Sequence, residues 1–143
     1  MFDSIKHWFD ALEQQGRLFE HPEDHGLQAA LASVLYHVIS ADHHLDARKK
    51  HEFTRILKQE LQLDDATVEH LYQAARSSSG DLHADLHTVN FYLKPKPLVR
   101  LEFMRKLLQL IDVEGTDPKQ LEIFFAALHE VFPEVKDLRD EEI

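Results

Sequence analysis

The apolar residues of this 143-residue chain recur at intervals of three and four positions, the spacing that places them on one face of an α-helix. Leucine occurs 21 times, whereas Val, Ile and Thr, which favour strands, together number 18. The alternation of apolar and polar residues that is typical of a half-buried strand is not the prevailing pattern. The sequence therefore predicts an all-α fold, a compact bundle of about seven helices.

The length indicates one domain, because a domain usually takes about 100 to 200 residues. We expect it to span residues 1–133, with an amphipathic N-terminal helix over 1–19, a helical core over 24–133 and a mobile acidic tail over 134–143. Residues 97–111 carry apolar side chains on two sides of a predicted helix. Such a broad apolar surface indicates that this helix is the central one in the bundle.

The charge balance excludes several classes of partner. The chain has 26 acidic and 16 basic residues, a net charge of −10, and we identify no local basic patch that offsets it. Such a surface repels phosphate backbones and anionic lipid, so we expect neither nucleic-acid binding nor membrane insertion. With no cysteine, no signal-peptide pattern at the start and no apolar run near the roughly 20 residues that span a bilayer, a cytoplasmic protein is expected.

Two helical hairpins in the chain resemble each other. Each consists of an apolar helix, an acidic turn and a second helix with an aspartate at its predicted N-cap. Any two helical hairpins align once gaps are allowed, but the matched acidic turn favours a true repeat. The paired positions include Leu35 and Leu107, Asp42 and Glu114, Asp46 and Asp117, and Phe53 and Phe124.

The two copies, VISADHHLDARKKHEFTRIL and QLIDVEGTDPKQLEIFFAAL, resemble the TerB-like family of bacterial proteins, named for tellurite resistance and also found as a domain of co-chaperones. The family pattern is Ala-Asp-Gly after one helix and an acidic residue early in the next. The resemblance covers about residues 24–133 and implies a non-catalytic role in tellurite resistance or stress. It also implies a divalent ion, Ca²⁺, Mg²⁺, Mn²⁺ or Zn²⁺, bound where the acidic turns meet. Its ligands would be Asp42, Asp46, Glu114 and Asp117.

The chain departs from this pattern at several of the positions that would form the site. His43 replaces the glycine of the first copy, and Arg48 and Lys49 stand where the family has a helix glutamate. In the second copy Gln120 and Leu121 lie near the expected acidic position. An alternative is therefore a protein-interaction or self-association module whose metal site is degenerate, with Asp46 and Asp117 serving only as helix caps.

The 11 histidines suggest a third hypothesis, a site for a transition metal such as Zn²⁺ or Ni²⁺. His43 and His44 adjoin the first acidic turn, and His83 and His87 are four residues apart on a predicted helix, a spacing that lets two imidazoles chelate one ion. Ordinary exposed positions also account for these histidines.

No enzymatic motif is present in the sequence. No serine lies in a Gly-x-Ser-x-Gly turn, and with four glycines the chain has no phosphate-binding loop, so we expect no catalytic residues.

The apolar face of the predicted N-terminal helix, which we call the N-terminal stripe, is rich in aromatic residues. Such residues are favoured interface anchors, although packing of the stripe on its own domain also accounts for them. The candidate partner-binding residues are Phe2, Ile5, Trp8 and Phe9.

Overall fold

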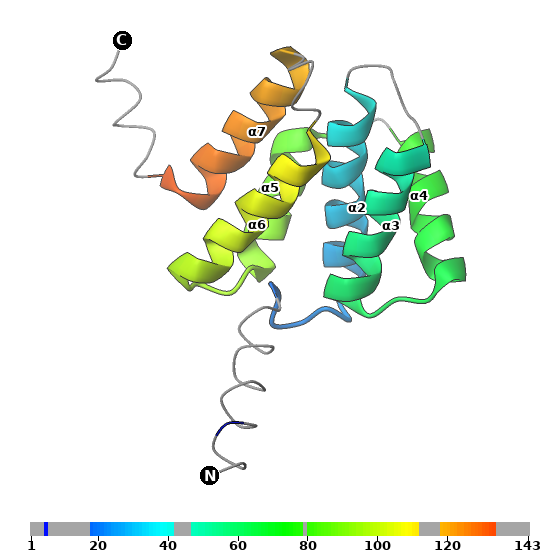
Figure 1. The fold of residues 1–143 in the computed structure, drawn as a ribbon, viewed down its shortest axis with the longest axis horizontal. Helices are drawn as coiled ribbons and strands as arrows, with labels where there is room; N and C mark the ends of the chain where they lie inside the picture. Colours follow the sequence, from blue (N-terminus) through cyan, green and yellow to red (C-terminus); the bar gives the residue numbers. More distant parts are fainter. Residues whose placement is uncertain (1–4, 6–17, 42–46, 79, 112–117, 134–143) are drawn as a thin grey trace.

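The computed structural model describes Ile5 and residues 18–41, 47–78, 80–111 and 118–133 (Figure 1). Within these residues it contains six α-helices and no strand, which confirms the predicted all-α bundle. The helix expected over residues 1–19 lies outside the described residues except for Ile5 and its last two positions. The helices are α2 (His25–Ser40), α3 (Ala47–Leu61), α4 (Asp65–Ser77), α5 (Leu82–Tyr92), α6 (Pro97–Leu110) and α7 (Pro118–Val131).

Several helices begin at an aspartate whose side chain accepts a backbone N–H that has no partner within the helix. Asp24 accepts the N–H of Leu27 at 3.0 Å at the start of α2. Asp64 caps α4 in the same way, and Asp81 caps α5. Pro97 occupies the first turn of α6, where its missing N–H would have no partner within the helix. The predicted caps Asp46 and Asp117 lie outside the described residues.

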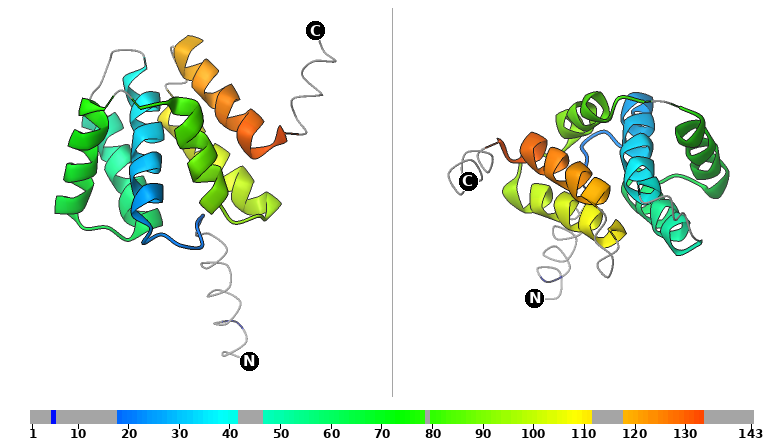
Figure 2. Two further views of the ribbon diagram at one scale, coloured as in Figure 1. Left: turned by 180° about the vertical axis from the view of Figure 1, so that it is seen from behind. Right: turned by 90° about the horizontal axis from the view of Figure 1, so that it is seen from above.

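The central helix is α2, and the prediction that residues 97–111 form it is wrong. α2 contacts each of the five other described helices and lies between the pair α3 and α4 on one side and α5, α6 and α7 on the other (Figures 1 and 2). Its sequence HGLQAALASVLYHVIS contains no Asp, Glu, Lys or Arg, so no face of it must stay in water. α6 carries four charged residues between positions 100 and 106, which keep one side of it at the surface.

The two apolar sides of α6 therefore have different environments. Val99, Phe103, Leu107 and Leu110 are at most 2% exposed and form part of the core. On the other side Leu98 is 74% exposed, Leu101 55% and Leu108 48%. We call these three residues the α6 leucine stripe.

The chain enters the bundle through an extended segment. The helical prediction does not hold for Leu18 and Phe19, because Phe19 forms an isolated antiparallel bridge with Leu93 and the carbonyl of Leu18 accepts the N–H of Lys94 at 2.9 Å. Both side chains are buried, at 1% and 3% exposure. Residues 18–19 are thus held beside the loop that leads into α6.

A buried amide joins the second hairpin to the first. Gln120, in the first turn of α7, is fully buried and its Nε2 donates to the carbonyl oxygen of Val38 at 3.1 Å. Val38 lies in the last turn of α2, where carbonyl groups lack partners within the helix. The hydrogen bond thus holds the start of α7 against the end of α2.

Replacing Gln120 with leucine removes this donor, so we expect Gln120→Leu to lower the free energy of unfolding by about 1–3 kcal/mol, the cost of leaving a buried polar group without its partner. Urea denaturation followed by circular dichroism measures the change. Glu122→Leu, at an exposed position of the same helix, is the matched control and should change stability by less than about 0.5 kcal/mol. Equal effects of the two substitutions would contradict the assigned role of Gln120.

The cap at Asp24 makes stability depend on pH in the acid range. The hydrogen bond from the Leu27 N–H, followed by one from the Tyr92 hydroxyl, lowers the pKa of Asp24 below its ordinary 3.8. A carboxyl whose pKa is lower in the folded state stabilises the fold above its ordinary pKa, and this contribution is lost as the pH falls through the lowered value. We expect Asp24→Asn, which keeps an acceptor but cannot titrate, to make the loss of stability below pH 3.8 shallower.

Urea denaturation at a series of pH values, compared with the wild-type chain, measures this slope. Glu20→Gln removes an exposed carboxyl close by and is the control. If the free energy of unfolding of Asp24→Asn falls as steeply below pH 3.8 as that of the wild-type chain, the cap does not carry the expected pH dependence.

Candidate functional site

The metal ligands implied by the sequence lie outside the described residues, but the helix ends that flank them are described. α2 ends at Ser40 and α3 begins at Ala47, while α6 ends at Leu110 and α7 begins at Pro118. The hydrogen bond from Gln120 to Val38 brings the start of α7 to the end of α2. The structure therefore brings together helix ends from the two hairpins. Outside the described residues are Asp42, Asp46, Glu114 and Asp117, together with His43 and His44.

Two buried polar residues occupy matching positions in the hairpins. Lys49 follows Asp46 by three positions, as Gln120 follows Asp117, and they are 3% and 0% exposed. These are the positions at or beside which the TerB-like pattern has an acidic residue. An ammonium group cannot ligate a metal ion and repels a divalent cation. The amide of Gln120 carries no negative charge, and its nitrogen donates to Val38. Neither of these two residues supplies the carboxylate that the family pattern has at this place.

The described histidines with chelate spacing lie on α5. His87 Nδ1 is 3.0 Å from Glu130 Oε1 on α7, and His83 is exposed and lines a hollow between α5 and α7 together with His129. The Nε2 atom of His129 is buried and has no hydrogen-bond partner in the structure. Among the described residues no three His, Asp or Glu side chains are placed to hold one metal ion. The pair His83 and His87 thus gains no further ligand from the described part of the bundle.

A hollow of about 370 Å³ lies between α2, α4 and α5. Within it the hydroxyl of Ser33 donates to Asp85 Oδ2 at 2.6 Å, and a Cβ atom at Gly80 would lie only 3.1 Å from each of these two oxygens. No imidazole or amine is among its described lining residues, so the Asp85 carboxylate is the one group there that could act as a base. The other lining residues are Gly26, Ala29, Ala30, Leu71, Ala74, Ala75, Ser78 and Thr88.

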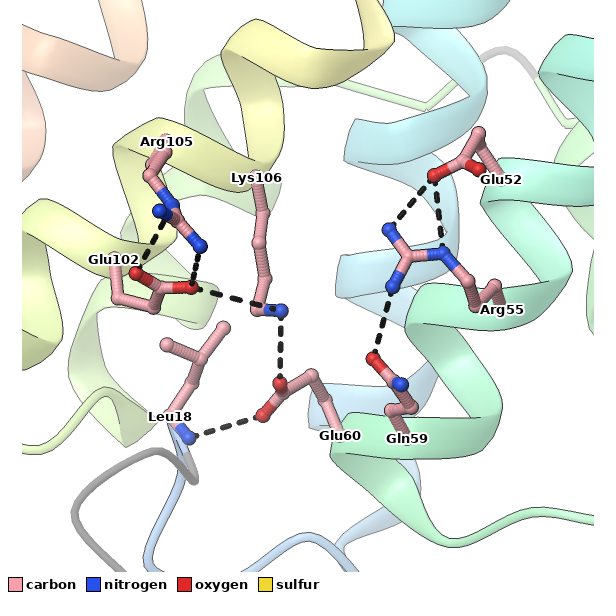
Figure 3. A network of polar contacts seen from close by, with 8 residues as sticks. All are labelled: Leu18, Glu52, Arg55, Gln59, Glu60, Glu102, Arg105 and Lys106. Carbon is pink, nitrogen blue, oxygen red and sulfur yellow. Dashed lines mark hydrogen bonds and ion pairs between the residues drawn. The ribbon is translucent and has the colours of Figure 1, made fainter. Parts of the chain in front are cut away.

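A buried carboxylate ties the entering segment to α3 and α6 (Figure 3). Glu60, on α3, is 6% exposed; its Oε2 accepts the N–H of Leu18 at 3.0 Å and its Oε1 lies 3.4 Å from Lys106 Nζ. Lys106 Nζ also lies 3.8 Å from Glu102 on its own helix. This network fixes where residue 18, and so the segment that precedes it, meets the bundle.

The segment that carries the α6 leucine stripe is rich in basic residues, which we call the basic patch, although Arg105 pairs with Glu102 and the mostly buried Lys106 pairs with Glu60. Between residues 94 and 106 there is one acidic residue, Glu102. The negative total charge conceals this stretch, and a count over a window of about a dozen residues would have found it. The exposed leucines could not be identified in this way, because their sequence spacing is also that of a core face. The basic residues are Lys94, Lys96, Arg100, Arg105 and Lys106.

The comparison with known families agrees with the resemblance of the two hairpins. The model of the family described as tellurite resistance protein TerB matches residues 28–116, which is more than half of the chain. The chain belongs to the TerB family. The matched region of this TerB chain runs from α2 to the residues after α6 and includes Asp42, Asp46 and Glu114, and it ends one residue before Asp117. Searches of the curated proteins and of the solved structures gave no match.

None of the described helices of this TerB-family chain is both long enough and apolar enough to cross a bilayer.

The buried network makes a prediction for the pair Glu60 and Lys106. Removing one member leaves the other charge buried, so we expect Glu60→Leu and Lys106→Met each to lower the free energy of unfolding by about 3–5 kcal/mol. The double variant should lose much less than the sum of the two, because neither charge is then left without its partner. Urea denaturation of the three variants measures the coupling.

The ion pair of Lys58 with Asp65 provides the control, because the side chains of these residues are 44% and 83% exposed. Lys58→Met should cost less than about 1 kcal/mol. Additive losses at Glu60 and Lys106 would contradict the assigned pairing.

Proposed function

We propose that this TerB-family chain is a non-catalytic module that acts by binding other proteins. The observation that carries the proposal is the α6 leucine stripe, three large apolar side chains exposed on one helix beside a basic patch. An apolar centre with a charged rim is the usual composition of a protein interface. The family supports a role in tellurite resistance or stress, and we place that role in a bacterial cytoplasm.

The N-terminal stripe supports the same function. Ile5, the one described member, is 50% exposed, so it is not enclosed by its own domain. Phe2, Trp8 and Phe9 share its helical spacing in the sequence and are proposed as further partner-binding residues.

The absence of a catalytic role is proposed from the chemistry of the hollows. The hollow between α2, α4 and α5 offers hydroxyls and one carboxylate, and that carboxylate already accepts a hydrogen bond from Ser33. The hollow between α5 and α7 offers imidazoles, with His87 engaged by Glu130 close by. The pair of Ser33 and Asp85 has no imidazole among the described lining residues of its hollow, so it lacks the hydroxyl–imidazole–carboxylate arrangement of a serine triad.

Metal binding at the acidic turns is the second candidate function, and the buried residues beside the turns weigh against it. Lys49 adds a positive charge where a divalent ion would need negative ones, and Gln120 is neutral. We infer that Asp42, Asp46, Glu114 and Asp117 no longer form a competent divalent site. The same inference extends to the histidine alternatives at His43, His44, His83 and His87.

Thermal melting of the metal-stripped chain tests this choice. An ion present at 100 times its dissociation constant would stabilise the fold by about 2.7 kcal/mol and raise Tm. We expect no rise with Ca²⁺, Mg²⁺, Mn²⁺, Zn²⁺ or Ni²⁺ added singly. In Lys49→Glu, which restores an acidic residue to α3, an oxygen-preferring ion should raise Tm above that of the same variant without metal.

A rise in the wild-type chain would support the metal function instead. If Ca²⁺, Mg²⁺ or Mn²⁺ causes it, Asp42→Ala with Glu114→Ala should abolish the effect. If Zn²⁺ or Ni²⁺ causes it, loss of the effect in His43→Ala or in His83→Ala would locate the site.

A further inference from the structure

Two apolar stripes of the chain are candidates for an interface. One is the α6 leucine stripe, whose three residues are exposed in the structure, and the other is the N-terminal stripe of the sequence, whose one described member, Ile5, is half exposed. Exposed leucines at helical spacing gain free energy when a second apolar surface removes them from water.

The two surfaces match in length. Leu98 and Leu108 are ten residues apart on α6, which is about 15 Å along a helix axis. Phe2 and Leu12 are also ten residues apart, with Ile5, Trp8 and Phe9 between them at the spacing of one helical face. A helix formed by residues 2–12 can therefore cover the whole α6 leucine stripe.

The two surfaces also carry opposite charge. Residues 94–106 contain five basic residues and one acidic residue, and because Lys106 is paired with the buried Glu60, the remaining net charge is +3. Residues 1–13 contain Asp3, Asp10 and Glu13 and one basic residue, Lys6, a net charge of −2. Charges of opposite sign beside an apolar stripe favour this pairing over the pairing of two α6 surfaces, in which the basic patches would repel each other.

The attachment point of the segment places it near α6. Leu18 is held by Glu60 and by the N–H of Lys94, three residues before Pro97 begins α6. Residues 13–17 connect Leu18 to the predicted apolar helix and extend at most about 18 Å. Two chains that approach through their α6 helices thus bring each N-terminal segment to the partner's stripe.

We propose that the α6 leucine stripe binds the N-terminal segment of a second copy of this chain. The exchange is reciprocal, so each chain covers the partner's stripe with residues 2–12 and the dimer is closed by a two-fold axis. This inference rests on the proposed protein-binding function and names its partner. Both stripes of both chains are removed from water in this arrangement, and each basic patch meets the acidic residues of the segment that covers it.

Sedimentation velocity of the full chain over a wide range of concentrations tests the proposal. The wild-type chain is expected to be a dimer that dissociates on dilution, and the affinity between the two chains should fall with added salt. Trp8 is the only tryptophan, so its emission should shift to longer wavelength as the dimer dissociates and the segment becomes exposed.

Two variants remove one surface each. The α6 variant, Leu101→Gln with Leu108→Gln, changes exposed positions and should be monomeric wherever the wild-type chain is dimeric, with long-wavelength Trp8 emission. The N-terminal variant, Trp8→Ala with Phe9→Ala, should also be monomeric. Gln109→Ser, at an exposed position on α6, is the control and should leave the dimer intact. Circular dichroism and Tm establish that each variant is folded.

Mixing the two variants distinguishes reciprocal exchange from other dimers. The α6 variant keeps its N-terminal segment and the N-terminal variant keeps its leucine stripe, so one intact contact should form between them. A heterodimer weaker than the wild-type dimer is therefore expected from two chains that are each monomeric alone.

Three results would overturn the proposal. A wild-type chain that stays monomeric at every concentration would do so, whether Trp8 is buried against its own chain or exposed. A dimer that persists in either variant would do so as well, as would a mixture of the two variants that remains monomeric. None of these results bears on the cation melting experiment, in which a rise in Tm would instead contradict the proposed function itself.

Discussion

The burial of α2, nine of whose sixteen residues are buried, is the constraint on which the rest of the structure depends. A helix of sixteen residues with no carboxylate, ammonium or guanidinium group can be surrounded without desolvating a charge. Its alanines at positions 29, 30 and 32 allow neighbouring helices to approach closely. The other five described helices contact it, so each needs only one apolar face, and the remaining faces are left for charges or for binding.

Polar contacts determine where the chain enters this core and how the two hairpins meet. Glu60 accepts a hydrogen bond from the Leu18 N–H and pairs with the Lys106 ammonium, and this places Leu18 beside α6. Gln120 holds α7 against the end of α2. Both groups are buried among apolar side chains, where a hydrogen bond or ion pair constrains geometry more strictly than an apolar contact does. The positions of the candidate surfaces follow from these contacts.

Membership of the TerB family does not by itself assign the activity of this chain. The family pattern predicts acidic residues early in α3 and α7, and the chain has a buried ammonium at Lys49 and a buried amide at Gln120 instead. Its most exposed apolar helix face, on α6, lies outside those turns. Our proposal therefore assigns function to a surface that the family motif does not contain.

The sequence alone determined the helical class and the family, because the first depends on local spacing and the second on short motifs. Tertiary structure decided which apolar residues form the core. Leu101 and Leu107 are the same residue type and both fit the apolar spacing of the α6 helix. Leu101 is nevertheless 55% exposed and Leu107 1%, because α2 covers the side of α6 that carries Leu107 and no described helix covers the side that carries Leu101. Helical periodicity shows that a face is apolar; only the position of the neighbouring helices shows whether that face is buried or available to a partner.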